Sequence, residues 1–213
     1  MNLKELEEKV KSLEEEVRTL KDIEQINKLQ RIYGYYLDHL MYDDVADLFT
    51  DDGILQLDAN VLEGKESIRD YWKSNQITAK KPGDVNNRLF VHMQLQGVVD
   101  IDQGGQTAKG RWQMLGLTVD YVGKPPGELQ PLIADGVYED EYVKEKGIWK
   151  IKRLIYNGNF TSTLQDGWVK TPIVERTHAP LRRLYDKTLD IPDRHWPSGY
   201  KVPFHFRNPV TGR

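Results

Sequence analysis

The run RLFVHMQLQGVVDID, residues 88–102, marks the point where the sequence changes from helical to strand periodicity. Three further strand-like runs follow it, separated by short turns: TAKGRWQMLGLTVDY, LIADGVYEDEYVKEKG and IWKIKRLIYNGNFTST. Apolar and polar residues alternate within these runs, as they do in strands with one buried face. Because the connecting turns are short and rich in glycine or proline, neighbouring runs are predicted to pair antiparallel. This half of the chain therefore predicts one antiparallel sheet.

Helical patterns occupy most of the sequence before residue 88. A long amphipathic stretch ends with RIYGYYLD at residues 31–38. YDDVADLFTDDG, residues 42–53, indicates a short second helix that stops at its glycine, and the following GILQLD alternates like a strand. In EGKESIRDYWKSN, residues 63–75, an isoleucine, a tyrosine and a tryptophan share one face of a third helix. Helices first and hairpin-connected strands afterwards indicate an α+β fold, with a curved antiparallel sheet over the N-terminal helices.

The first twenty residues carry an apolar seam with alternating spacings of three and four. The seam residues are Leu3, Leu6, Val10, Leu13, Val17 and Leu20. Charged residues occupy the other faces, so we expect a coiled-coil-like helix for oligomerisation or docking. Valine at alternate seam positions favours two strands, and the alternative is an amphipathic helix that lies on its own domain. Asp22 is a candidate cap or break between this helix and the next.

The sequence from Gln165 onward is less regular. Residues 179–190, APLRRLYDKTLD, predict a helix, and four prolines follow it without periodicity. We expect this extension to cover the functional site or to clasp a neighbouring subunit. The expected organisation is an N-terminal heptad helix at 1–21, a central functional domain at 22–163 and a C-terminal extension at 164–213.

Composition limits the possible partners. The 213 residues, 38% of them hydrophobic, suffice for one core, and 30 basic against 33 acidic residues give a net charge of −3. Bulk charge therefore points to neither nucleic acid nor an acidic membrane surface. The chain has no cysteine, which excludes disulfides and thiol chemistry. No apolar stretch approaches the roughly 18 to 20 residues of a membrane span, and charges begin at the fourth residue, so we expect a cytoplasmic protein without a signal peptide.

Asp38 and His92 are the candidate catalytic pair. Histidine, with an ordinary pKa of about 6.5, accepts and returns protons near neutral pH, and a carboxylate on its far nitrogen fixes the tautomer. Alternation within the strand puts His92 on one face with Phe90 and Gln94, an aromatic ring and an amide. Spacing alone leaves open that His92 is a core histidine and Asp38 an ordinary acid at a helix end.

The order of elements and several motifs resemble the SnoaL-like group of the nuclear transport factor 2-like (NTF2-like) superfamily, whose fold is a cone-shaped α+β barrel. The motifs are DIEQINKLQRIYGYYLDHLMYDDVADLFTDDG, GKESIRDYW and GVYEDEYVKEKGIWKI. The resemblance covers about residues 20–163. Within the superfamily the chain is most similar to lyases, namely bile acid 7α-dehydratases, hexachlorocyclohexane dehydrochlorinases and scytalone dehydratases.

The resemblance implies roles for single residues. In the first two lyase groups an aspartate at the end of the first domain helix pairs with a histidine on the following strand, which implies a catalytic dyad of Asp38 and His92. Tyr33 matches a helix tyrosine of the bile acid 7α-dehydratases, and the expected assisting phenol is Tyr33, Tyr35 or Tyr36. Leu57 lies where the related lyases have a pocket tyrosine on the first strand, and Gly158 lies where they have an arginine late in the last strand. Because these two residues differ, the resemblance does not identify the substrate. The candidate substrate-binding residues are Tyr35, Tyr36, Phe90, Trp112, Tyr138, Tyr156 and Asn157.

The resemblance and the dyad together imply a lyase that needs no cofactor and no metal. The expected substrate is a bulky hydroxylated aromatic or polycyclic compound, and the expected leaving group is water or a small aldehyde, such as formaldehyde from a lignin-derived diaryl compound in aromatic catabolism. The alternatives are an isomerase or polyketide cyclase of the same fold, and a non-catalytic ligand-binding or assembly module. The related lyases imply a homotrimer, and the seam leaves a dimer as the alternative.

Overall fold

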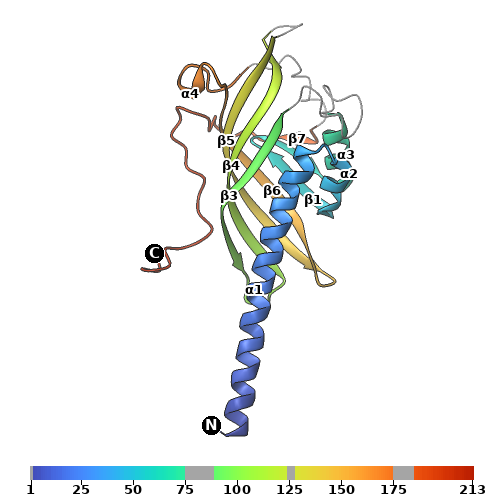
Figure 1. Ribbon diagram of the computed structural model, residues 1–213, viewed down its shortest axis with the longest axis vertical. Coiled ribbons are helices and arrows are strands. Elements are labelled where there is room, and N and C mark those ends of the chain that lie inside the picture. Colours follow the sequence, from blue (N-terminus) through green and yellow to red (C-terminus); the bar gives the residue numbers. More distant parts are fainter. Residues whose placement is uncertain (1, 75–88, 124–127, 175–184) are drawn as a thin grey trace.

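One long helix lies across one face of a curved sheet, and two short helices pack near the sheet edge at β1 and β2 (Figure 1). The computed structural model describes residues 2–74, 89–123, 128–174 and 185–213. The helices are α1 (Leu3–Asp38), α2 (Tyr42–Asp47), α3 (Lys65–Ser74) and α4 (Gly167–Lys170). None of the helices in these residues is long and apolar enough to cross a membrane.

The sheet has seven strands in the order β3-β4-β5-β6-β1-β2-β7 and is not closed. Its strands are β1 (Phe49–Leu57), β2 (Asn60–Glu63), β3 (Phe90–Ile101), β4 (Thr107–Val122), β5 (Glu128–Glu145), β6 (Ile148–Thr163) and β7 (Lys187–Thr188). The four long predicted runs are confirmed as β3 to β6, paired as successive antiparallel neighbours. The α+β class is confirmed, but the sheet is mixed, because β1 runs parallel to β6. No short turn joins these two strands, so local sequence does not fix their relative direction.

Predictions for the shorter elements are confirmed in part. The third helix is α3, and its isoleucine, tyrosine and tryptophan are buried as expected. The second helix ends earlier than predicted, because buried Phe49 already belongs to β1 and pairs with Ile151. Residues 185–190 of the predicted tail helix are not helical and include β7. The rest of that predicted helix lies outside the described residues. The same holds for residues 77–87, ITAKKPGDVNN, whose proline, glycine and lack of periodicity predict a loop.

The helix α1 is unbroken, so the prediction of a break at Asp22 is wrong. Asn2 caps the helix, since its side chain accepts a hydrogen bond from the Glu5 backbone N–H at 2.9 Å. Asp22 is buried inside the helix and accepts hydrogen bonds from Lys144 Nζ at 2.6 Å and Trp149 Nε1 at 2.9 Å. A buried carboxylate needs such donors. Asp22 therefore anchors α1 where the helix first meets the sheet.

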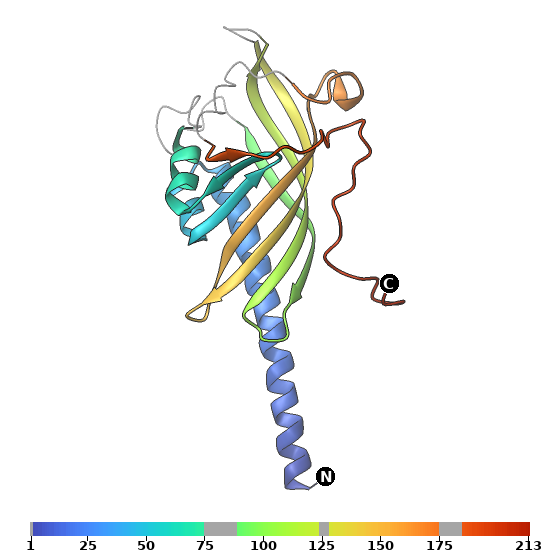
Figure 2. The same ribbon diagram turned by 180° about the vertical axis from the view of Figure 1, so that it is seen from behind.

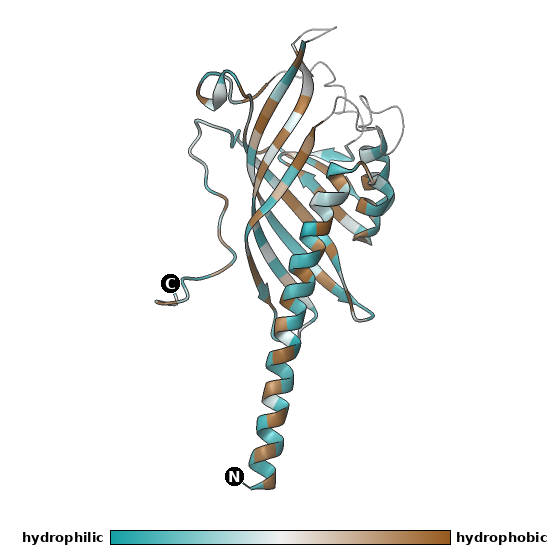
Figure 3. Ribbon diagram, viewed as in Figure 1, coloured by the Kyte–Doolittle hydropathy of each residue, from teal (hydrophilic) through white to brown (hydrophobic). Residues whose placement is uncertain are grey.

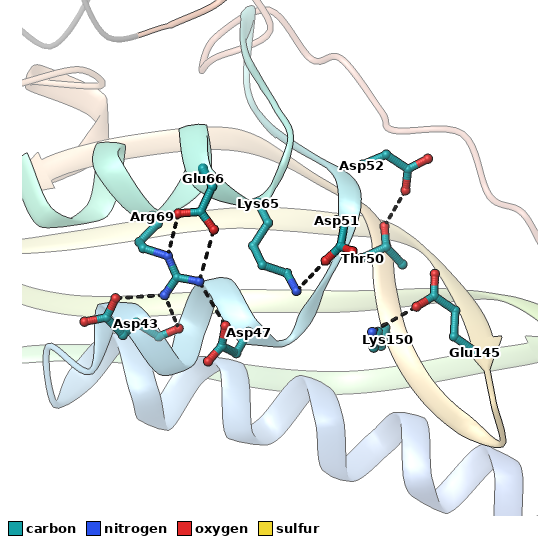
Figure 4. Close-up of polar contacts among 10 residues, drawn as sticks. All are labelled: Asp43, Asp47, Thr50, Asp51, Asp52, Lys65, Glu66, Arg69, Glu145 and Lys150. Atoms are coloured by element: carbon teal, nitrogen blue, oxygen red, sulfur yellow. Dashed lines mark hydrogen bonds and ion pairs between the residues drawn. The ribbon is translucent and has the colours of Figure 1, made fainter.

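Charged pairs join α2, α3 and the start of β1 (Figure 4). The guanidinium of Arg69 on α3 bonds Asp43 Oδ1 at 2.8 Å and Asp47 Oδ1 at 3.0 Å, both on α2. Lys65 Nζ contacts Asp51 Oδ1 in β1 at 2.8 Å. These carboxylates are solvent-exposed, so each pair contributes little stability on its own. Their role is to fix how the two short helices sit beside the strand.

The C-terminal extension packs on the sheet face opposite to α1. Figure 2 shows it from behind, running from β7 across the strands. Arg111 and Glu139 alternate with buried inner residues of β4 and β5, and His205 Nδ1 bonds Glu139 Oε1. Arg111 also donates to the carbonyl oxygens of Val202 at 3.3 Å and Pro203 at 3.2 Å. The last part of the extension therefore covers the convex side of the sheet.

His195 holds another part of this extension. Its Nε2 lies 3.6 Å from Asp58 Oδ2 and its Nδ1 lies 2.6 Å from Asp193 Oδ1. These contacts, with Asp58 first, raise the pKa of His195 to about 9. Since the ordinary value is about 6.5, the protonated ring stabilises the docked segment fully below that pH, and the stabilisation is lost as pH rises through 9.

We predict that residues 193–200 open more often at pH 10 than at pH 7. Hydrogen exchange of these amides, corrected for its intrinsic pH dependence, measures the opening. A His195→Gln variant serves as control because glutamine does not titrate in this range. Equal extra opening in both proteins would show that His195 is not the group responsible.

Candidate active site

The last turns of α1 approach β3 unusually closely at Gly34. A Cβ atom on Gly34 would lie 2.9 Å from the carbonyl oxygen of His92 and 3.2 Å from Cγ of Gln94. Only glycine leaves room for this distance between helix and strand. Asp38 follows four residues later, so it projects from the same helix face one turn further on. The close approach thus places the Asp38 carboxylate against the strand that carries His92.

Asp38 and His92 meet as predicted from the sequence. Asp38 Oδ1 accepts a hydrogen bond from the backbone N–H of His92 at 2.8 Å and lies 3.0 Å from His92 Nδ1. The carboxylate accepts, so Nδ1 carries the hydrogen and Nε2 keeps a lone pair for a substrate proton. The Asp38 and His92 side chains remain 15% and 17% exposed. The pair is therefore oriented from two directions and still accessible.

Aromatic side chains surround the dyad. The Phe90 ring meets the His92 ring edge to face, with centroids 4.3 Å apart. Burial raises the pKa of Tyr138, and the negative charges of Asp140 and Asp38 add to this effect, while a hydrogen bond with Gln94 opposes it. The phenol of Tyr138 thus stays protonated at neutral pH close to the dyad.

Tyr33 and Tyr156 flank Tyr138. The Tyr33 ring packs edge to face on Tyr138 with centroids 6.1 Å apart, and the Tyr156 ring lies 5.1 Å from Tyr138. Burial raises the pKa of Tyr33 well above its ordinary value, so this phenol is also neutral. Three of the candidate phenols therefore form one continuous cluster on the inner face of the sheet.

The other candidate residues lie elsewhere. Tyr35 is 66% exposed on the solvent side of α1, whereas Tyr36 is partly buried and packs against the core. Trp112 is buried and donates from Nε1 to the Tyr142 hydroxyl at 3.0 Å, which makes it a core residue. Asn157 is paired with Val137 on the face away from the dyad and accepts a hydrogen bond from Arg194 at 2.8 Å.

Sequence reasoning missed a buried polar network that supports β3. Tyr142 donates to Gln30 Oε1 at 2.8 Å, and Gln30 Nε2 donates to Gln94 Oε1 at 2.9 Å. Asp140 Oδ2 lies 3.3 Å from the same tyrosine hydroxyl, whose single hydrogen is already used. Burial raises the pKa of Asp140 well above its ordinary value, and Asp140 Oδ1 also accepts a hydrogen bond from the Ile155 backbone N–H at 3.0 Å. The signal available in the sequence was Gln94, two residues after His92 on the same strand face.

The structure also contains a cavity away from the dyad. It has a volume of about 630 Å³ near the β3–β4 turn and is lined by Asp100, Lys109, Glu141 and His205 among others. Neither member of the dyad lines this cavity. Among the described residues, no three His, Asp or Glu side chains form a group that could hold a metal ion.

The fold and these positions agree with a known family. A family model described as a SnoaL-like domain matches residues 18–155, more than half of the chain. The chain belongs to the SnoaL-like family. The match begins in α1 and includes both Asp38 and His92. The match leaves outside it the seam residues from Leu3 to Val17 and the C-terminal extension of this SnoaL-like protein.

Solved structures share the SnoaL-like fold. A putative scytalone dehydratase from Novosphingobium aromaticivorans superimposes with a TM-score of 0.57 at 20% sequence identity, covering 68% of this chain and 89% of that one. The structure of LinA gives a TM-score of 0.57 at 16% identity, covering 71% and 95%. A type 2 hexachlorocyclohexane dehydrochlorinase (LinA) gives 0.55 at 18% identity, covering 70% and 93%. At these identities the likeness shows the fold alone.

We predict that Gly34→Ala separates α1 from β3 and weakens the dyad. Alanine in an ordinary helix is about 1 kcal/mol more favourable than glycine, but here the added methyl meets the backbone of His92. We therefore expect a lower free energy of unfolding, measured with denaturant, and loss of the downfield NMR resonance of the His92 Nδ1–H proton. Tyr35→Ala, an exposed neighbour on α1, should preserve the resonance. Higher stability of Gly34→Ala with an unchanged resonance would contradict the close approach.

Proposed function

We propose that this SnoaL-like protein is a cofactor-independent lyase that uses His92 as general base and Asp38 as its orienting carboxylate. The contact of Asp38 Oδ1 with both the backbone N–H and the Nδ1 of His92 carries the proposal. With Nδ1 bonded to Asp38, Nε2 is the ring nitrogen left to accept a proton, as a general base must. The lyases among the structures of similar fold support this class of reaction, as the SnoaL-like fold also includes dehydratases and dehydrochlorinases.

The neutral phenols of the cluster provide hydrogen-bond donors that complement the general base. Tyr138 and Tyr33 keep their protons because burial raises both pKa values. A protonated phenol donates a hydrogen bond to an oxygen that becomes negative during the reaction. Tyr138 is the favoured candidate, because it hydrogen-bonds Gln94, which shares a strand face with His92. Tyr33 then supports Tyr138 through ring packing and remains a candidate donor.

The proposed substrate is a bulky hydroxylated aromatic or polycyclic compound. The rings of Phe90, Tyr138 and Tyr156 provide apolar and aromatic surface beside the base. Leu57, at the position where a pocket tyrosine was expected, pairs with Tyr156 across β1 and β6 and adds apolar surface. Such lining favours flat, largely uncharged molecules.

Two reactions fit a single base. In a dehydration, His92 takes a proton from carbon, the C–H electron pair forms a double bond, and hydroxide leaves the adjacent carbon and is protonated to water. In an aldehyde release from a diaryl propanediol, His92 takes the proton of the primary hydroxyl. The C–C bond then breaks to give formaldehyde, its electron pair forms the double bond, and hydroxide leaves from the next carbon. Both reactions produce an alkene conjugated with an aromatic ring.

We predict that His92→Ala and Asp38→Ala each reduce turnover by roughly a hundredfold or more, because proton transfer by a positioned base contributes about that much. The assay follows the ultraviolet absorbance of the conjugated alkene from hydroxylated diaryl substrates, with trapping of released aldehyde to separate the two reactions. His39→Ala is the matched control, since the side chain of this neighbouring exposed histidine hydrogen-bonds, among the described residues, only the Tyr35 carbonyl oxygen, from Nδ1 at 2.8 Å.

Full turnover in both dyad variants would reject the assignment of the base. An isomerase or cyclase, the nearest alternative, would instead exchange a substrate C–H with deuterated water without releasing water or aldehyde. A binding module would retain ligand affinity in all variants and show no turnover in the wild type.

A further inference from the structure

The N-terminal half of α1 extends beyond the sheet with an uncovered apolar stripe. Figure 3 shows hydrophobic and hydrophilic residues alternating along this free part of the helix. The six seam residues, Leu3 to Leu20, are between 44% and 73% exposed. The first buried residue of α1 is Asp22, so residues before it rest on nothing within the described chain. Since most helical stability in proteins comes from packing of an apolar face, a partner on the seam would stabilise this part of α1.

The seam does not face its own sheet. A helix turns by about 100° per residue, so Val17 in the seam and Ile26 in the sheet-facing stripe, nine residues apart, lie on opposite sides of α1. Ile26 is fully buried, and Tyr33, seven residues later on nearly the same side, is also buried against the sheet. The orientation argues against the alternative in which the seam lies on its own domain. No other part of the described residues covers it.

The seam has the heptad pattern of a two-stranded coil. Leu3, Val10 and Val17 occupy the a positions, and Leu6, Leu13 and Leu20 occupy the d positions. β-Branched residues at a with leucine at d favour two helices over three or four. Identical seams satisfy this pattern most simply, so the structure favours a second copy of the same chain as partner.

Charges beside the seam select the orientation. Lys9 and Glu16 occupy g positions, and Glu14 and Lys21 occupy e positions. In a parallel, in-register pair each g residue faces the e residue five positions later on the partner, which gives Lys9 opposite Glu14 and Glu16 opposite Lys21. In an antiparallel pair that aligns the same seam, Lys9 would face Glu16, but Glu7 would face Glu14, so a pair of like charges would offset the attractive one. Charge complementarity therefore favours the parallel arrangement.

The ion pairs within the helix leave these charges available. Lys4 with Glu8 and Arg18 with Glu15 pair on the outer b and f positions. Within the described residues, Lys9, Glu14 and Lys21 form no ion pair inside the chain, and Glu16 only accepts a hydrogen bond from Ser12. We propose that residues 3–21 form a parallel, in-register, two-stranded coiled coil between two copies of this chain.

Cysteine cross-linking tests the proposal in the full-length protein, which has no cysteine of its own. Val10→Cys should form a disulfide between copies under mild oxidation, because identical a positions face each other only in the parallel register. An antiparallel pair would instead link Val10→Cys to Leu13→Cys in a mixture and leave Val10→Cys alone unlinked, which would overturn the proposal. Failure of all cross-links, or sedimentation showing three chains joined through this segment, would overturn it as well.

Charge reversal gives an independent test. Lys9→Glu should raise the dissociation constant of the pair by roughly tenfold, since two symmetry-related contacts change from attractive to repulsive. The double variant Lys9→Glu with Glu14→Lys should restore association, measured by sedimentation equilibrium. Lys11→Glu, the same change on the outer face, is the matched control. An equal effect of Lys11→Glu, or no rescue by the double variant, would contradict the g to e pairing.

Discussion

The close packing of α1 on β3 is the contact on which the candidate site depends. Gly34 allows the helix backbone to approach His92, and Asp38, one turn later, then bonds both the backbone and the ring of that residue. Two hydrogen bonds into one carboxylate oxygen hold the helix end and the imidazole in a single geometry. A bulkier residue at position 34 would push the helix away from the strand and separate Asp38 from His92.

The inner face of the sheet supports this contact through residues that perform no chemistry. Asp22 fixes the middle of α1 to β5 and β6, and the network from Asp140 through Tyr142 and Gln30 to Gln94 ties the helix to β3 beside the dyad. Each polar side chain of this network has a hydrogen-bond partner, as the low polarity of the core demands. The result is a hydrogen-bonded frame that ends at the Asp38–His92 pair, which stays accessible to solvent.

Local patterns predicted much of this structure. Alternation and short turns identified β3 to β6, and helical periodicity identified α3 with its buried face. The contact of Asp38 with His92 followed from family resemblance, because no local pattern places two residues 54 positions apart together. The parallel pairing of β1 with β6 and the partnership of Gln30 with Gln94 depend on long-range packing, which spacing does not reveal. Asp22 was misjudged because a buried aspartate inside a helix is acceptable only when distant donors reach it.

Because α1 is continuous, the direction of the seam around the helix axis is fixed relative to the direction of the sheet. One uninterrupted helix carries the exposed seam at one end and Asp38 at the other, about 27 Å beyond Leu20 at 1.5 Å per residue. One extra residue between the two segments would turn the seam by about 100° relative to the sheet, whereas seven would nearly restore the original direction. Both halves would remain intact after either insertion, yet a joined copy would point its sheet another way. The number of residues between the seam and Asp38 therefore sets both the distance and the rotation between the seam and the sheet. Together these two quantities determine where the domain of a second copy can lie.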